Sequence, residues 1–487
     1  MTSARDRPHK YADDGFELLP ISTRSGPRTL RVTRWSPEME RVLRESGVQR
    51  VLVDRSWEHR GTSLAFLGKF AEQIRCVEVS SQTVTDLSHL EALTHLEQLI
   101  LECPVDSLDF TKLPELTKCV LAHPATLGNV HESRSLRDLA LFDLKVADLA
   151  QVKGITQLRR LYLNHLASLA TLGGIDALPL EEVHLIDLTR LRSIAPLTAL
   201  RNVRAITVAG CRRVADFARV GELGSLERLT ITSGPRLQSF QFLAGLGNLE
   251  ELGIWNTPVE ETGGSLASLQ GLRKLRVLKL LSTKGRIIDV PVVGRIPSLE
   301  ILFLDGAGEL ASLTFLRGLR LLREFALSRT EIGDGDLGVL LALPNLERVH
   351  SMSPQHSHYS HTLEQIDAAL QARHPQRRPL ADPNAGEAIF GVFDRLTARG
   401  VPRERDHTHA LEIVAQQREA ELVQQFGSWE SLVDAVIDIL IARREEKGLS
   451  DKFEEIITVA GKQVTVTGRM VRGKPRVEMI QFLTGDA

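Results

Sequence analysis

Histidine-rich segments are the parts of this sequence whose residue types could do chemistry. Residues 353–361 read Ser-Pro-Gln-His-Ser-His-Tyr-Ser-His, which brings His356, His358 and His361 close together. Imidazole binds zinc, but zinc sites usually add cysteine or carboxylate ligands. Because the segment itself offers neither, we interpret it as a solvated loop and keep a metal site as the alternative.

A second polar cluster, Asp406-His407-Thr408-His409, precedes a predicted helix. An aspartate beside two histidines could serve general acid–base catalysis, but the same pattern is typical of a helix cap with surface histidines. No P-loop, GxSxG or HExxH motif occurs in the sequence. We therefore assign no catalytic, cofactor-binding or metal-binding residue.

The four cysteines, Cys76, Cys103, Cys119 and Cys211, have no CxxC spacing. Two of them fall on predicted strands and the other two in the turns that follow strands. This placement favours small buried apolar side chains over ligands or disulfides. We therefore expect a reducing, cytoplasmic environment.

Bulk composition narrows the range of partners. The formal net charge is −2, which gives no global attraction for nucleic acid or an anionic membrane. No uncharged apolar run reaches the roughly 18 residues of a membrane span. The N-terminal segment from Met1 to Pro20 mixes both charge signs and lacks the apolar core of a secretory signal. Oligomeric state cannot be read from these features.

Leucine is concentrated in residues 101–350, where a segment of the form L-x-x-L-x-L recurs. Clear copies start at Leu96, Leu136, Leu158, Leu226, Leu249, Leu275 and Leu299, with weaker copies at Leu116, Leu180, Val203, Leu322 and Leu346. Two more precede them, at Val48 and Ile74. The fourteen copies recur at a nearly constant spacing, which indicates a repeat array.

The spacing within each copy predicts a short strand with one buried face, because side chains alternate along a strand. A single unit is too short to bury its own leucines. Stacked units share them, and their strands form one parallel sheet on the concave side of a solenoid. The sequence therefore predicts an α/β solenoid with a concave parallel sheet.

The repeats resemble the leucine-rich repeat superfamily, and their short period is similar to the bacterial internalin-type and phosphatase-regulator-type classes. The resemblance covers residues 48–352 and implies little or no α-helix on the convex side. One feature departs from the family: the asparagine expected two residues beyond each strand is missing, and we therefore expect an irregular ladder with differently stabilised turns. The residues in its place are Pro104, Pro124, Leu144, Cys211, Thr257, Thr283 and Thr330.

Residues between and just after the strand leucines should face the concave side. Two groups of aromatic, aliphatic and basic side chains fall on neighbouring predicted strands there. Exposed aromatics on such a face are typical anchors for a partner protein; docking of a flanking segment of the same chain, or no role, are the alternatives. The predicted partner-binding residues are Phe142, Tyr162, His184 and Ile186 in the first group and Trp255, Lys279, Leu281 and Phe303 in the second.

The flanks lack the repeat and define the remaining domains. Residues 1–47 form a predicted N-terminal cap, with a helix that starts at Pro37. Residues 48–352 are the solenoid, and 353–383 a His/Pro-rich linker in which Thr362–Ala372 reads as a helix. Residues 384–487 are predicted to be a small α+β domain, with helices followed by a three-stranded β-meander.

Taken together, these patterns favour a non-catalytic scaffold that binds a protein of unknown identity on the concave face. The alternative is an effector-type enzyme in which the repeats select the substrate and residues 384–487 carry the activity. Basic hairpin residues allow nucleic-acid contact, but interleaved acids and missing stacking aromatics favour a solvated face. The basic residues are Lys462, Arg469, Arg472, Lys474 and Arg476.

Overall fold

A computed structural model describes eleven stretches of the chain. These are residues 16–19, 28–54, 64–81, 83–124, 126–260, 264–281, 287–353, 356–374, 452–459, 462–471 and 474–482. The chain divides into two compact units, Met1–Arg378 and Pro379–Ala487. The predicted helices between 384 and 441 and the Asp406–His409 cluster lie outside the described residues.

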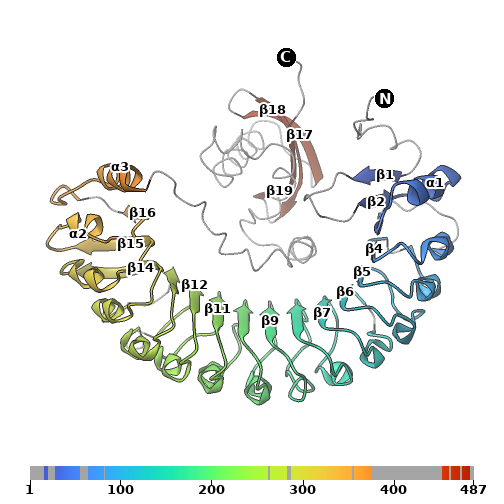
Figure 1. The fold of residues 1–487 in the computed structure, drawn as a ribbon, viewed down its shortest axis with the longest axis horizontal. Helices are drawn as coiled ribbons and strands as arrows, with labels where there is room; N and C mark the ends of the chain where they lie inside the picture. The colour runs from blue at the N-terminus through green and yellow to red at the C-terminus, as the bar shows by residue number, and fades with distance from the viewer. Residues whose placement is uncertain are drawn as a thin grey trace. The chain divides into compact units, whose positions relative to one another are not determined.

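The first unit is built on one 16-stranded sheet whose strands follow sequence order (Figure 1). β1 pairs antiparallel with β2, and every later pair is parallel. The strands are β1 Phe16–Leu19, β2 Thr29–Val32, β3 Arg50–Val53, β4 Cys76–Val79, β5 Gln98–Leu101, β6 Lys118–Ala122, β7 Asp138–Phe142, β8 Arg160–Asn164, β9 Glu182–Ile186, β10 Ala205–Ala209, β11 Arg228–Thr232, β12 Glu251–Trp255, β13 Val277–Leu281, β14 Ile301–Leu310, β15 Glu324–Ile332 and β16 Arg348–Ser353.

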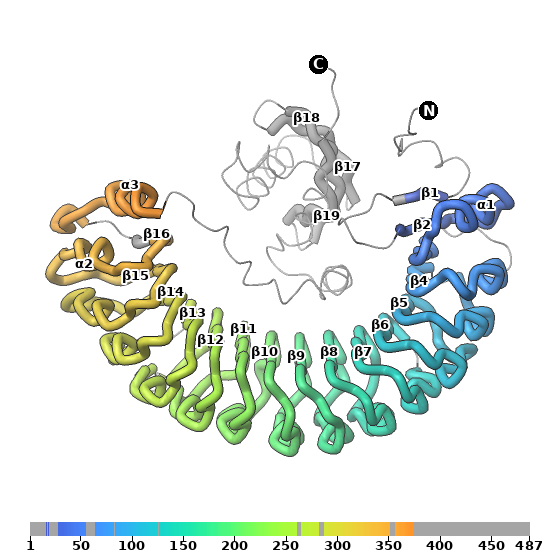
Figure 2. Tube along the Cα trace, viewed as in Figure 1, coloured from blue at the N-terminus to red at the C-terminus, as the bar shows by residue number. Residues whose placement is uncertain are grey.

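The predicted leucine-rich repeat solenoid is confirmed: the fourteen predicted copies are β3 to β16, and their strands line the inner side of the arc (Figure 2). The structure adds β2, which continues the parallel sheet into residues assigned to the cap. Its Thr-Leu-Arg-Val segment alternates like a strand, with Leu30 and Val32 fully buried. It was missed because no leucine-rich segment of its own precedes it.

Short 3₁₀ helices, rather than α-helices, occupy most of the outer connections, as the resemblance implies. Each puts one or more apolar residues into the shared core, so the strand leucines and the connection leucines pack together. They are η2 Ala65–Phe70, η3 Ser88–Ala92, η4 Phe110–Lys112, η5 Val130–Glu132, η6 Ala150–Val152, η7 Ala195–Ala199, η8 Phe217–Glu222, η9 Gln241–Gly245, η10 Ala267–Gly271, η11 Val290–Arg295 and η12 Thr314–Gly318.

The turn after each strand is more regular than the sequence predicts. From β6 to β12 the residue just beyond each strand has a positive φ, and its N–H donates to the last carbonyl of the next strand. Aspartate, asparagine, histidine and glycine dominate this column, and most of them tolerate that conformation. Its members are His123, Asp143, His165, Asp187, Gly210, Ser233 and Asn256.

Polar side chains replace the missing asparagine at some of these turns, as expected. The Cys211 thiol donates to the carbonyl of Leu185 at 3.4 Å, and the Thr257 hydroxyl donates to that of Trp255 at 2.8 Å. Among the described strands of this sheet, the register shifts in the last rungs, between Asp305 and Gly308 and between Ala326 and Leu327.

Both ends of the sheet carry a helix that covers core leucines. α1, Pro37–Glu45, is the predicted N-terminal helix; Ser36 caps it, and Met39 and Leu43 are buried. At the other end lie α2, Gly338–Leu341, and α3, Leu363–Arg373. Thr362 and Gln365 form a capping box on α3, and the helix packs on β16.

The second unit contains the predicted β-meander. β17 Lys452–Val459, β18 Lys462–Val471 and β19 Lys474–Phe482 form a three-stranded antiparallel sheet, with a register shift between Thr467 and Gly468. Across the whole described part of the chain, no helix combines the length and apolarity needed to cross a bilayer.

Candidate functional site

The concave face consists of three columns of side chains, because each five-residue strand places its first, third and fifth residues on the same side. β9 contributes Glu182, His184 and Ile186, which pair in register with Ala205, Thr207 and Ala209 of β10. Sequence reasoning identified the second and third columns but missed the first, which is rich in charge. The same alternation, extended by two residues toward the strand start, would have found it.

The first aromatic cluster consists of Phe142, Tyr162, His184 and Ile186, and the structure brings these residues together. The rings of Phe142 and Tyr162 lie 5.3 Å apart, centroid to centroid, and those of Tyr162 and His184 lie 5.7 Å apart. Ile186 is in register with Asn164, the last residue of β8.

The expectation that this cluster is exposed is wrong for two of its members. Phe142 is 2% exposed and Tyr162 is 6% exposed, whereas His184 and Ile186 are half-buried. Stacking between neighbouring rungs accounts for part of this burial, because each ring covers a face of the next. The residues that precede Tyr162 in the second column, Ile100, Val120 and Ala140, are buried as well.

Charged side chains of alternating sign occupy the first column, beside the first aromatic cluster. Asp138 accepts a bidentate pair from Arg160, with Nε at 2.7 Å, and Glu182 accepts from Arg228 at 2.9 Å. Burial, reinforced by Arg228 and Arg160, lowers the pKa of His184 to about 4. His184 is therefore a neutral imidazole at physiological pH.

The second aromatic cluster consists of Trp255, Lys279, Leu281 and Phe303. Trp255 and Leu281 are in register, and so are Lys279 and Phe303. The Trp255 ring folds back over Gly253, where a Cβ atom would lie 2.3 Å from the indole. Trp255, Leu281 and Phe303 are all half-buried, so each keeps an accessible surface.

Lys279 and His350 hold the Phe303 ring from two sides. The Lys279 ammonium lies 5.2 Å from the ring centroid, a cation–π distance. Lys279 is only 9% exposed, and this burial lowers its pKa, although Glu324 and Glu251 partly counteract the effect.

His350 lies two strands from Phe303, yet the two rings meet edge to face at 5.0 Å. They do so across the small side chain of Ala326, which occupies the intervening rung. The imidazole also lies 3.2 Å from the Glu324 carboxylate. His350 and Glu324 are thus parts of this site that sequence reasoning did not select.

Small residues separate the two aromatic clusters. Thr207 and Ala209 of β10, and Thr230 and Thr232 of β11, occupy the same columns and are half-buried. The face therefore offers two ring-rich patches with a flatter polar strip between them. Rings, aliphatic side chains and cations suit packing and cation–π contacts with a protein, rather than bond-breaking chemistry.

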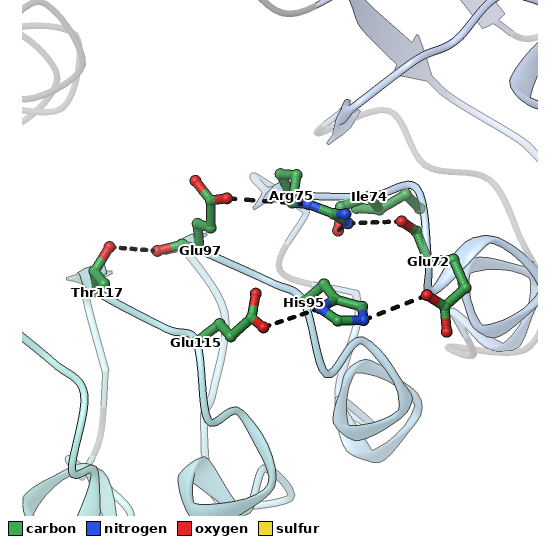
Figure 3. A network of polar contacts seen from close by, with 7 residues as sticks. All are labelled: Glu72, Ile74, Arg75, His95, Glu97, Glu115 and Thr117. Carbon is green, nitrogen blue, oxygen red and sulfur yellow. Dashed lines mark hydrogen bonds and ion pairs between the residues drawn. The ribbon is translucent and has the colours of Figure 1, made fainter.

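A separate ladder of polar contacts links the segments that lead into β4, β5 and β6 (Figure 3). His95 bridges two carboxylates on neighbouring rungs, Glu72 at 3.3 Å and Glu115 at 3.0 Å. Arg75 donates to the Glu72 carbonyl at 2.8 Å and lies 4.0 Å from the Glu97 carboxylate. Partly exposed pairs of this kind each contribute about 0–1 kcal/mol, so we interpret the ladder as a rim that keeps rungs in register.

Two surface hollows lined by described residues lie away from the aromatic clusters. One, of about 470 Å³, is lined by residues of outer connections that include Gly128, His131 and Gln151. A second, of about 340 Å³, lies among Glu300, Arg323 and His374. Neither of these two hollows includes a residue of the aromatic clusters.

Comparison with solved structures finds several that are similar to part of this chain. An internalin, InlF, of Listeria monocytogenes is 17% identical, covering 59% of this chain and 75% of its own, with a TM-score of 0.43. A leucine-rich repeat protein of Leptospira interrogans is 15% identical, covering 66% and 93%, with a TM-score of 0.39. The plant peptide hormone receptor RGFR1, solved in complex with RGF2, is 14% identical, covering 67% and 58%, with a TM-score of 0.41. No protein-family model and no curated protein sequence matches the chain.

Proposed function

We propose that the solenoid is a non-catalytic recognition module that binds a partner protein on its concave face. The observation that carries the proposal is the second aromatic cluster. Trp255, Leu281 and Phe303 present partly open apolar surface on neighbouring strands of a rigid sheet. Aromatic anchors fixed before binding lose little conformational entropy, which is why such residues dominate interface energetics.

The burial pattern sharpens which residues make the contact. In the first aromatic cluster, His184 and Ile186 keep accessible surface, whereas Phe142 and Tyr162 on the neighbouring strands are buried. Lys279 acts by orienting the Phe303 ring, since it lies under that ring and is itself buried. The proposed contact therefore spans β9 to β14.

The experiment uses the full chain with Trp255 and Phe303 both changed to alanine. Proteins captured from the native cell by the wild-type chain should be lost with this variant, with affinity reduced by a hundredfold or more, since anchors each contribute about 2 kcal/mol or more. Leu321→Ala is the matched control, because Leu321 is 50% exposed and lies outside both clusters. Unchanged capture by a double variant with an unchanged circular dichroism spectrum would contradict the proposal.

The effector-type enzyme, with its activity in residues 384–487, remains the second interpretation of the sequence. Nothing observed in the described residues of that range, 452–459, 462–471 and 474–482, favours it.

A reducing, cytoplasmic setting is part of the proposal and rests on the thiols. All four cysteines are free and buried. Burial raises the pKa of Cys76 to about 11 and those of Cys103 and Cys211 to about 12, which keeps these groups as unreactive thiols. Titration with a thiol reagent checks this: four thiols should react after denaturation without reductant and almost none before it.

A further inference from the structure

The histidine-rich segment after β16 is an ordered part of the first unit in the range 356–361. It rests on the turn between β15 and α2 through four hydrogen bonds. The Ile332 N–H donates to the Tyr359 hydroxyl at 3.1 Å, and the Ile332 carbonyl accepts from His358 Nε2 at 3.0 Å. The Ser360 N–H donates to the Gly335 carbonyl at 2.8 Å, and its hydroxyl accepts from the Leu337 N–H at 3.0 Å.

This docking supplies the carboxylate that the sequence segment lacks. Glu331, near the end of β15, lies beside the segment, and ligand atoms of Glu331, His356 and His358 all lie within 4.8 Å of one another. Two imidazoles and one carboxylate thus converge from two separate stretches of chain, one before β16 and one after it. The rings of His356 and His358 lie 5.5 Å apart, centroid to centroid.

The hydrogen bonds leave ring nitrogens available to a cation. Because a carbonyl can only accept, the bond from His358 to Ile332 places the ring proton on Nε2 and leaves the lone pair on Nδ1. A backbone carbonyl that orients a histidine in this way is the usual support of a metal ligand. In His356, Nε2 is buried and makes no hydrogen bond with the described part of the chain. Burying such an atom without a partner costs desolvation energy, which a bound cation would offset.

We propose that Glu331, His356 and His358 bind a divalent transition metal ion of the zinc type. Imidazole nitrogen and carboxylate oxygen both coordinate zinc at about 2.0–2.2 Å, and three protein ligands leave one position for water. Calcium and magnesium prefer sites made of oxygen alone, so this donor set selects against them. Tetrahedral coordination would bring ligand atoms to about 3.4 Å from one another, so binding requires small rotations of the exposed Glu331 and His358 side chains.

The consequence is a metal clamp between the end of β15 and the segment that leads into α3. It fastens the C-terminal cap of the solenoid and uses none of the proposed contact residues of β9 to β14. The clamp therefore does not depend on the proposed function.

The test is calorimetric titration of the full chain with zinc, supported by the absorption spectrum of the cobalt form. We expect one equivalent of tightly bound zinc, intense cobalt bands typical of a four-coordinate site, and a higher melting temperature that a chelator reverses. His358→Ala, His356→Ala and Glu331→Gln should each weaken zinc binding by more than about tenfold, because removing a ligand costs at least as much as removing one of its outer-shell partners.

His361→Ala is the matched control, since His361 belongs to the same segment but bonds Ser360 at 2.8 Å and lies outside the ligand group. It should change zinc affinity less than threefold. Because Glu331 is exposed, Glu331→Gln tests the site without disturbing the core. The proposal is overturned if the wild-type chain binds no zinc equivalent. It is equally overturned if Glu331→Gln binds like wild type while His361→Ala loses as much as His358→Ala, the result expected of an unspecific histidine-rich loop.

Discussion

At the scale of single residues, Gly253 leaves the space that the Trp255 ring occupies on the concave face. The Trp255 ring lies over Gly253, and a Cβ atom there would stand 2.3 Å from the ring atom Cη2. Gly253→Ala should therefore lift the indole off the sheet and destabilise the fold by about 1–2 kcal/mol, the usual cost of overpacking. Tryptophan fluorescence should shift to longer wavelength, and urea denaturation measures the free energy.

Gly247→Ala is the matched control for that substitution, because a Cβ atom at Gly247 meets nothing within 4 Å. It should leave both the emission spectrum and the free energy of unfolding close to wild type. Equal effects of the two substitutions would show that backbone conformation, and not the indole, sets the response at position 253.

A second residue-scale prediction concerns His184, whose pKa burial lowers to about 4. Between pH 6.5 and pH 4 the unfolded imidazole binds a proton that the folded one does not, so unfolding takes up a proton. The free energy of unfolding should fall as pH is lowered through this window, by at most about 1.4 kcal/mol per pH unit, and should be insensitive to this group above it. His184→Asn should flatten that slope.

Denaturant unfolding of the wild-type protein and of His184→Asn at pH 4.5, 5.5 and 7.0 measures how steeply the free energy of unfolding depends on pH in each. The difference between them isolates His184 from the other histidines. Parallel slopes would contradict a lowered pKa at this position.

The sequence predicts the face on which a residue lies better than it predicts how accessible that residue is. Alternation places Phe142 and Tyr162 on the concave side, yet both are buried. Accessibility depends on neighbours across strands, which lie a full repeat or more away in sequence. Phe303 and His350 show why such contacts are hard to predict. Their rings meet across the intervening strand because its residue there, Ala326, is small.

At the scale of elements, the strands were predictable and the turns were not. Leucine spacing identified β3 to β16 because burying one face imposes a period of two on every strand. Turn geometry depends on φ, which the leucine pattern does not report. The residues at positive φ, from His123 to Asn256, directly follow their strands, one position before the site of the asparagine that the family carries. Their asparagine, aspartate and glycine content was a weak sequence signal for this turn.

Asp143 tests what this turn column contributes, since its φ is 55° and its carboxylate contacts the imidazoles of His123, at 3.4 Å, and His165. Asp143→Ala should destabilise the fold by about 1–3 kcal/mol, through both the lost contacts and the strained backbone. Asp143→Gly loses the same contacts but relieves the strain, so it should be the more stable of the two by about 1 kcal/mol. Urea denaturation of both variants separates the two terms, and a glycine variant less stable than the alanine one would contradict the strain argument.

At the scale of the first unit, stability is passed from rung to rung. Each described strand of this sheet pairs only with its sequence neighbours, and side-chain contacts such as Glu182 with Arg228 and Phe303 with His350 reach one rung further. Stability in such arrays is close to a sum over neighbouring pairs, and opening starts at the ends. The leucine excess explains the uniform rungs, and we expect the terminal helices to slow opening of the end rungs, which they cover.

The C-terminal cap gives the sharpest test of this view. Leu370 of α3 is fully buried, and Arg373 of the same helix donates to the carbonyls of Leu343 at 2.9 Å and Leu341 at 2.6 Å. Leu370→Ala should remove about 2–5 kcal/mol of local packing. Hydrogen exchange followed by mass spectrometry should then show faster exchange in β15 and β16 and unchanged exchange in β8 and β9. Leu185→Ala, in the central strand β9, should instead raise exchange on both sides of its own rung. Equal acceleration of every peptide by Leu370→Ala would mean that the sheet opens as one unit, and that the terminal helix stabilises the whole array instead of its last rungs.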